Sequence, residues 1–126
     1  ARGIAMLRRR GFVAPVSNGN VSLMAALARR NGFHWDAILG AEFARDYKPK
    51  PDVYLSACVA FDYAPEDCMM VAAHSDDLAA AAACGLMTGF VARPNEKGPG
   101  RGESAPRIAV DVAGDDLVDL AEKLFG

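Results

Sequence analysis

The sequence predicts an α/β fold, in which a parallel β-sheet is flanked by helices. Two observations predict it: short apolar runs alternate with segments whose apolar residues have helical spacing, and glycines, prolines and polar clusters separate them. One run, residues 68–73, is continuously apolar, as expected of a strand buried on both faces. A chain of 126 residues is expected to form a single domain, residues 1–126.

The elements predicted in the first half are a helix end at 1–10, a strand at 12–16, a helix at 21–30 and a short strand at 35–39. Three arginines followed by Gly11 are typical of a helix C-terminus, where cations and glycine are both favoured. Residues 47–51 are expected to form a rigid loop, because two prolines fix φ and remove two hydrogen-bond donors.

The elements predicted in the second half are a helix after Asp52, a turn at 64–67, a strand at 68–73, an alanine-rich helix at 77–84, a strand at 87–92, a last strand at 108–112 and an amphipathic helix at 115–125. Asp52 is a suitable N-cap for the first of these helices. Residues 95–106 contain three glycines and two prolines, which predicts a loop.

Composition excludes several classes of protein. A net charge of −2 provides no electrostatic footprint for nucleic acid, and no apolar run approaches the roughly 20 residues that span a bilayer. The three cysteines, Cys58, Cys68 and Cys84, have no CxxC spacing and are expected to be buried thiols rather than disulfides or a zinc site. A cytoplasmic location is expected. The first residues have no signal-peptide layout and no initiator Met, so two origins stay open: the chain is the interior of a longer protein, or it is a truncated gene product.

Three short motifs lie at or near the ends of predicted strands. They are Ser17-Asn18-Gly19, Tyr47-Lys48-Pro49 and the segment from His74 to Asp77. Because the carboxyl ends of parallel strands meet at one edge of a sheet, we expect these groups to lie close together. A hydroxyl, an amide, a lysine and a carboxylate at that edge would hold an anion and steer a reaction.

Each motif also has a purely structural interpretation. Ser17 and Asn18 are favoured helix caps, and so are acids such as Asp77 at the start of a helix. Most lysines are solvated surface residues, and this structural interpretation suits Lys50 better than Lys48. His74 is either a general base or a structural residue. No ligand set with metal spacing surrounds His74, so no metal site is predicted.

Taken in order, these motifs resemble the second, third and fourth motifs of the haloacid dehalogenase superfamily, over about Gly11 to Pro94. The resemblance implies a Rossmann-like parallel sheet. Magnesium-dependent phosphatases of that superfamily carry a second acid four residues before the position of Asp77, where this chain has Ala73. The chain is therefore more similar to the 2-haloacid dehalogenases, which need no metal and no cofactor.

The resemblance also implies roles for the candidate residues and a small 2-haloacid as substrate. Ser17 and Asn18 would bind the substrate carboxylate or orient the nucleophile, and Tyr47 and His74 would contribute to substrate binding. Lys48 would keep the nucleophilic carboxylate ionised, because a nearby cation favours the charged form. Asp77 would pair with Lys48 and help to position the hydrolytic water.

The aspartate nucleophile of that family lies on an earlier strand, and no aspartate precedes Ser17 in this chain. The core is therefore expected to be incomplete, lacking the first strand and the cap domain, and the chain alone is expected to be inactive. Without that central strand, the strands at 12–16 and 68–73 would be either separated or forced together. A magnesium-dependent phosphatase and a non-catalytic remnant remain alternative functions, and a homo-oligomer is left open.

Overall fold

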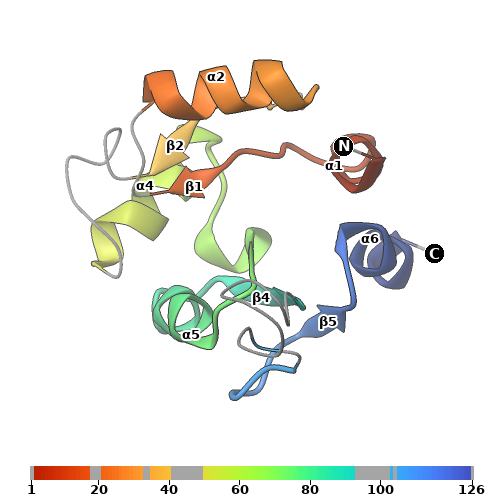
Figure 1. Ribbon diagram of the computed structural model, residues 1–126. Coiled ribbons are helices and arrows are strands. Elements are labelled where there is room, and N and C mark those ends of the chain that lie inside the picture. The colour runs from red at the N-terminus through yellow and green to blue at the C-terminus, as the bar shows by residue number, and fades with distance from the viewer. Residues whose placement is uncertain are drawn as a thin grey trace.

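The structure, a computed structural model, describes residues 2–17, 21–32, 35–40, 50–92, 103 and 105–125. Its strands are β1 (Val16–Ser17), β2 (Leu39–Gly40), β3 (Met69–Ala72), β4 (Met87–Val91) and β5 (Val112–Gly114). β1 and β2 pair in parallel, and β3, β4 and β5 form a second parallel sheet in that order (Figure 1). This arrangement confirms the predicted α/β fold with a parallel sheet.

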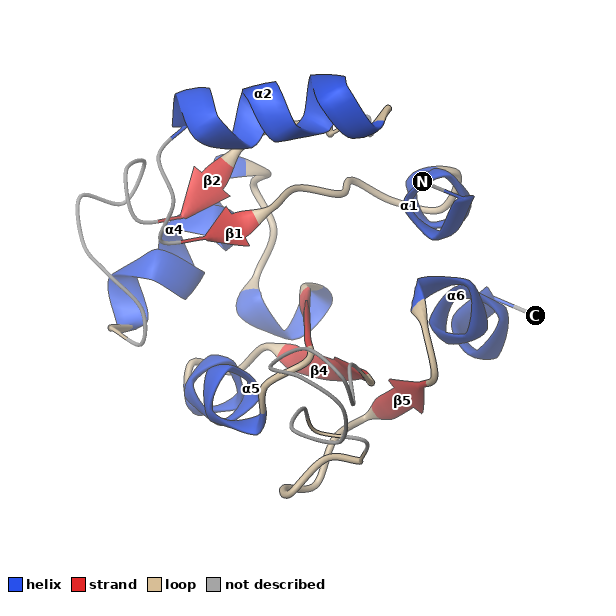
Figure 2. Cartoon of the chain, viewed as in Figure 1, coloured by secondary structure: helices blue, strands red, loops and turns tan. Residues whose placement is uncertain are grey.

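The helices are α1 (Arg2–Arg8), α2 (Val21–Asn31), α4 (Pro51–Ala60), the short 3₁₀ helix η1 (Pro65–Asp67), α5 (Ser75–Ala83) and α6 (Leu117–Phe125). They surround the strands of both sheets, with α2 and α4 beside β1 and β2, and α5 beside β4 (Figure 2). Within the described ranges, no helix is long and apolar enough to cross a membrane.

The two sheets are separate. Within the described part of the chain β1 pairs only with β2, and β3 pairs only with β4, so no hydrogen-bonded ladder joins β1 to β3. This is the separated arrangement, one of the two alternatives that the sequence left open. What connects the sheets is side-chain packing: Val16 of β1 lies against the buried cluster that is centred on β3 and β4.

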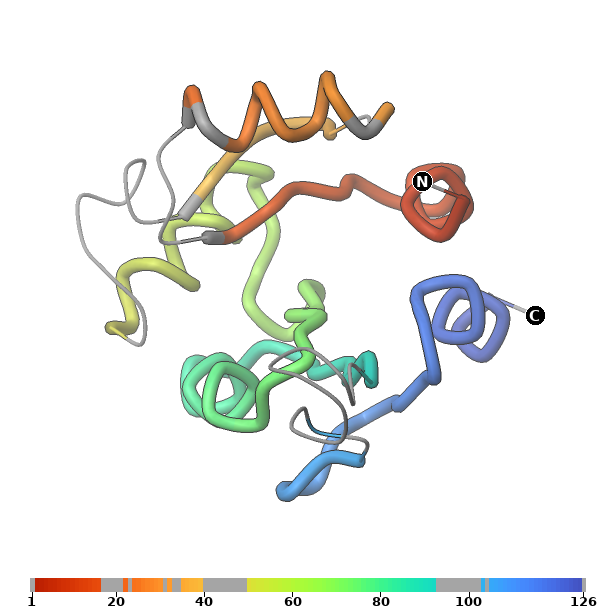
Figure 3. Tube along the Cα trace, in the orientation of Figure 1, coloured from red at the N-terminus to blue at the C-terminus, as the bar shows by residue number. Residues whose placement is uncertain are grey.

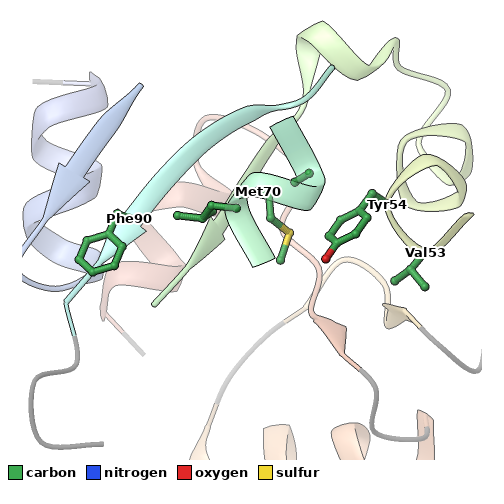
Figure 4. Packing of buried hydrophobic residues seen from close by; sticks show 6 residues of the cluster. Val53, Tyr54, Met70 and Phe90 are labelled. Carbon is green, nitrogen blue, oxygen red and sulfur yellow. The ribbon is translucent and has the colours of Figure 1, made fainter. Parts of the chain in front are cut away.

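That cluster is the core of the molecule. Its buried members come from α4, β3, α5 and β4, and they are Val53, Tyr54, Met70, Leu78, Ala81 and Phe90. Figure 4 shows Tyr54 of α4 facing Met70 of β3, with Phe90 farther along the sheet. Burying a side chain of this size stabilises the fold by about 1.5–3 kcal/mol, so this cluster fixes α4 and α5 against the sheet.

The first and last helices, α1 and α6, lie side by side (Figure 3). Gly3 permits their close approach, because a Cβ at this position would lie 2.4 Å from Leu117 Cβ and 2.9 Å from the Leu117 carbonyl carbon. Arg10, just beyond α1, places its guanidinium 5.6 Å from the centre of the Phe125 ring, within the range of a cation–π interaction.

The predicted strands at 12–16 and 35–39 are wrong in extent, since only the last residue of each belongs to a strand. The preceding segments are held differently. The Asp36 carboxylate accepts the backbone N–H of Val13 at 2.7 Å, and Val13 O accepts the Asp36 N–H at 2.8 Å. Arg8 donates to the same carboxylate, which fixes α1 against this region.

The prediction that residues 68–73 are buried on both faces is also wrong. Only Met70 of β3 is buried, because β3 has a neighbouring strand on one side alone within the described residues. The last strand begins at Val112 rather than at 108. Before it, the Asp111 carboxylate accepts the Thr88 N–H at 2.8 Å and the Asp111 N–H donates to Thr88 O at 3.1 Å, so a side chain and the backbone together link Asp111 to β4.

Three smaller expectations also change. Helix α4 begins at Pro51, and Asp52 lies inside its first turn rather than capping it. Helix α5 begins at Ser75, two residues earlier than predicted, while the loop predicted at 95–106 lies mostly outside the described residues. Of the cysteines, all three are free thiols, but only Cys58 is buried and the other two are half-buried.

Candidate functional site

The predicted site residues fall on both sheets, and the structure describes some of them. Ser17 is the last residue of β1, and His74 and Asp77 lie just after the carboxyl end of β3. Asn18, Tyr47 and Lys48 lie outside the described residues. Their place in the site therefore stays a prediction, made from their position directly after β1 and shortly before α4.

Helix α5 carries the two described candidates in its first turn. His74 is the N-cap residue with extended backbone angles (φ −119°, ψ 124°), and its side chain makes no capping hydrogen bond. The His74 carbonyl accepts the Leu78 N–H at 3.3 Å, which starts the helix. Asp77 is half-buried in the first turn of the helix, so its carboxylate is held by a rigid element and not by a loop.

Tyr54, a buried residue of α4, makes a hydrogen bond with Asp77. The Tyr54 hydroxyl donates to Asp77 Oδ1 at 2.5 Å, although the two residues belong to different helices. Tyr54 is only 1% exposed. Burial, and then the hydrogen bond to the Asp77 carboxylate, raises the pKa of Tyr54 far above its ordinary value, so at neutral pH the phenol stays protonated and donates. The pair fixes the direction in which the Asp77 carboxylate points.

A second set of hydrogen bonds holds the start of α5 from the other side. Glu103 accepts the backbone N–H of Ser75 at 3.1 Å and the Ser75 hydroxyl at 2.6 Å, one on each carboxylate oxygen. The Ser75 hydroxyl in turn accepts the backbone N–H of Arg107 at 2.9 Å. The Arg107 guanidinium donates to Glu103 at 3.0 Å and lies 3.8 Å from the exposed carboxylate of Asp76.

These contacts lower the pKa of Glu103. The hydrogen bond from the Ser75 hydroxyl is the largest cause, opposed by desolvation, and the Ser75 backbone and Arg107 add to it. Glu103 is therefore a carboxylate at neutral pH. Its negative charge lies at the N-terminus of α5, where the helix dipole favours an anion.

Sequence reasoning missed Tyr54, Ser75, Glu103 and Arg107 as parts of this region. A signal existed for Tyr54: a tyrosine on the buried face of a helix needs a partner for its hydroxyl. No local signal existed for Glu103. It stands in a glycine-rich segment 28 positions from Ser75, and only the fold brings the two together.

A cavity of about 670 Å³ lies elsewhere, between α1, α2 and the segment before β2, and its lining includes Arg8, Arg29 and Trp35. Among the predicted site residues that the structure describes, none lines this cavity. Across the residues that the structure describes, no group of three or more His, Cys, Asp or Glu side chains is arranged to hold a metal ion. The geometry at α5 is that of a positioned carboxylate with a phenol donor.

The chain was compared with known proteins. Residues 1–85 match the haloacid dehalogenase-like hydrolase family. The chain belongs to the haloacid dehalogenase-like hydrolases. This membership agrees with the resemblance found in the sequence motifs.

Solved structures of this hydrolase family include close matches. The L-2-haloacid dehalogenase PA0810 is 44% identical with a TM-score of 0.93, over 98% of this chain and 55% of that one. The defluorinating L-2-haloacid dehalogenase Rha0230 is 38% identical with a TM-score of 0.94, over 99% and 51%. An L-2-haloacid dehalogenase from Xanthobacter autotrophicus, at 23% identity and a TM-score of 0.82 over 99% and 59%, shares the fold.

No curated protein matches the chain. The chain spans about half the length of the solved dehalogenases that it matches. This coverage agrees with the expected incomplete core of a haloacid dehalogenase-like hydrolase.

Proposed function

We propose that this chain is the core portion of a 2-haloacid dehalogenase, which cleaves the carbon–halogen bond of a small 2-haloacid to give a 2-hydroxy acid. The observation that carries the proposal is the 44% identity to the dehalogenase PA0810 over 98% of the chain. Ala73 supports it, because a magnesium-dependent phosphatase would have a carboxylate at this position.

The proposed chemistry has two steps and needs no metal. An aspartate carboxylate, supplied by a strand that this chain does not contain, attacks C2 of the substrate and expels halide, which forms an ester. Water then attacks the ester carbonyl, and the 2-hydroxy acid leaves while the aspartate is regenerated. Such covalent catalysis divides one difficult step into two easier ones.

The residues of this chain bind the substrate and prepare both steps. Ser17 and Asn18 bind the substrate carboxylate, with Tyr47 and His74 beside it. Lys48 keeps the nucleophile ionised. Asp77 pairs with Lys48 and orients the attacking water, and its own direction is fixed by the Tyr54 hydroxyl at 2.5 Å.

The separated sheets support the location of the missing nucleophile. β1 and β3 each have a sheet partner on one side alone within the described residues, and the predicted site residues follow the carboxyl ends of both strands. A parallel strand placed between β1 and β3 would satisfy both edges and would deliver its own carboxyl end to the same site.

The test is halide release from 2-chloropropionate and 2-bromoacetate without added metal. We expect release by the full-length protein, extended upstream to its natural start, and none by residues 1–126 alone. Lys48→Met and Asp77→Asn in the full-length protein are expected to lower the rate at least a hundredfold. The matched control is Lys50→Met, two residues from Lys48, which is expected to keep the wild-type rate.

Two outcomes would overturn the proposal. If the full-length protein releases no halide but hydrolyses p-nitrophenyl phosphate when magnesium is added, the protein is a phosphatase of the same superfamily. If it does neither, a non-catalytic role replaces the enzymatic one. Halide release by residues 1–126 alone would show instead that the nucleophile lies within this chain.

A further inference from the structure

We propose that Glu103 is a positioning residue for the site: its carboxylate holds the first turn of α5, and through it the Asp77 carboxylate, in the reactive arrangement. This inference rests on the proposed function for its catalytic consequence. The contacts that carry it belong to the described residues alone.

Ser75 is the point of attachment. It is 1% exposed, so water does not compete for its polar atoms. The backbone N–H and the hydroxyl hydrogen both go to Glu103, at 3.1 and 2.6 Å, and the hydroxyl oxygen accepts the Arg107 N–H at 2.9 Å. Removing the Glu103 carboxylate leaves two buried donors without a partner, which is costly enough to shift the turn that carries them.

Asp77 lies between two anchors. Ser75, two residues earlier in the same helical turn, is held by Glu103, while the Tyr54 hydroxyl holds Asp77 itself from α4. A displacement of the first turn therefore moves the Asp77 carboxylate relative to Tyr54. Small displacements of reacting groups lower rates strongly, so the effect on turnover is expected to exceed the effect on substrate binding.

Arg107 makes a carboxylate at this place compatible with an anionic substrate. Its guanidinium lies 3.0 Å from Glu103 and 3.8 Å from Asp76, so the charge of Glu103 is balanced locally. Glu103 can then satisfy the helix N-terminus without repelling a 2-haloacid. The two parts of Arg107 are separable: its backbone holds Ser75, and its side chain neutralises Glu103.

The first experiment uses the present chain and needs no catalysis. The Tyr54 hydroxyl proton, assigned by its loss in Tyr54→Phe, is expected to give a downfield proton NMR signal because this buried hydroxyl donates to the Asp77 carboxylate. Glu103→Ala is expected to shift that signal upfield by more than 1 ppm, or to abolish it by exchange with water. The matched control is Glu122→Ala, an exposed glutamate on α6, which is expected to leave it unchanged.

The second experiment measures halide release by the full-length protein. Glu103→Ala is expected to lower kcat at least tenfold with less than a twofold change in KM, and Glu103→Gln, which keeps one acceptor oxygen, to recover part of the loss. Arg107→Ala, which keeps the backbone bond to Ser75, is expected to raise KM for the anionic substrate more than it lowers kcat.

The outcomes separate this inference from the proposed function. An unchanged Tyr54 signal in both Glu103 variants would refute the positioning role, whatever the substrate is. A shifted signal in a protein that releases no halide would leave the positioning role standing and refute the haloacid assignment. If Glu103→Ala does not fold, the Tyr54 hydroxyl signal of Glu103→Gln provides the test instead. Equal losses of kcat in Glu103→Ala and Glu122→Ala would also refute the inference.

Discussion

Replacing Tyr54 by Phe tests the link between α4 and α5 that holds the candidate carboxylate. The substitution removes one hydroxyl and keeps the ring in the core, so the packing with Met70 is retained. A hydrogen bond to a charged group contributes about 1.5–3 kcal/mol, and the half-buried Asp77 recovers part of this from water. We therefore expect a loss of about 1.5 kcal/mol in the free energy of unfolding. For a chain of this length, that loss lowers Tm by about 6 °C.

The assay is urea unfolding followed by circular dichroism at pH 7. The midpoint is expected to fall while the slope stays constant, because the surface exposed on unfolding does not change. Tyr63→Phe is the matched control, since Tyr63 is 49% exposed, and it is expected to change stability by less than about 0.5 kcal/mol.

A double-mutant cycle isolates the pair itself. Asp77→Asn changes every contact of Asp77, but the coupling between Tyr54→Phe and Asp77→Asn reports their mutual interaction and is expected to be about 0.5–3 kcal/mol. The reasoning is refuted if Tyr54→Phe unfolds at the wild-type midpoint, if Tyr63→Phe loses as much, or if the two substitutions are additive.

Three further predictions concern the fold. Gly3→Ala is expected to lower the free energy of unfolding by about 1–3 kcal/mol in urea, because the added Cβ would collide with α6. Gly11→Ala is the control and is expected to be neutral, because a Cβ there has no atom within 4 Å. Leu78→Ala, at a fully buried position, is expected to cost about 2–5 kcal/mol in the same assay, and a loss below 1 kcal/mol would contradict its place in the core. The hydrogen bond from Arg8, and then that from Val13, lowers the pKa of Asp36, so its stabilisation is present above the ordinary aspartate pKa of about 4 and is lost as pH falls through the lowered value. Asp36→Asn is therefore expected to make Tm fall less steeply as the pH is lowered, in thermal unfolding measured from pH 7 down to pH 2.

The sequence predicted the helices better than the strands, for a physical reason. Helical hydrogen bonds are local, so the alanine-rich run and the glycine that follows it were enough to place α5 within two residues of its observed start and one of its observed end. A strand exists only where a partner lies alongside. Residues 12–15 are apolar enough for a strand, yet Val13 bonds to the Asp36 carboxylate, and Phe12 is 60% exposed and stacks on Phe61.

The candidate site shows the same contrast between what local sequence predicts and what depends on contacts distant along the chain. Positions directly after a predicted strand, such as Asp77, were found because chain order and strand ends are readable from the sequence. Tyr54 and Glu103 were not, because their partners are distant along the chain and the contacts depend on how α4 and α5 are packed. Helical periodicity marks Tyr54 as buried but does not say which carboxylate its hydroxyl reaches.

The contact between Gly3 and Leu117 also limits the order of assembly during synthesis. Helix α1 cannot complete its packing until α6, more than 100 positions later in the sequence, has been synthesised. Before that point α1 has only nearer contacts such as the ion pair between Arg8 and Asp36, while α4, β3, α5 and β4 follow one another closely and become able to pack as they emerge. Contacts between segments so distant in sequence form slowly, and an incompletely packed helix is the kind of surface that chaperones bind.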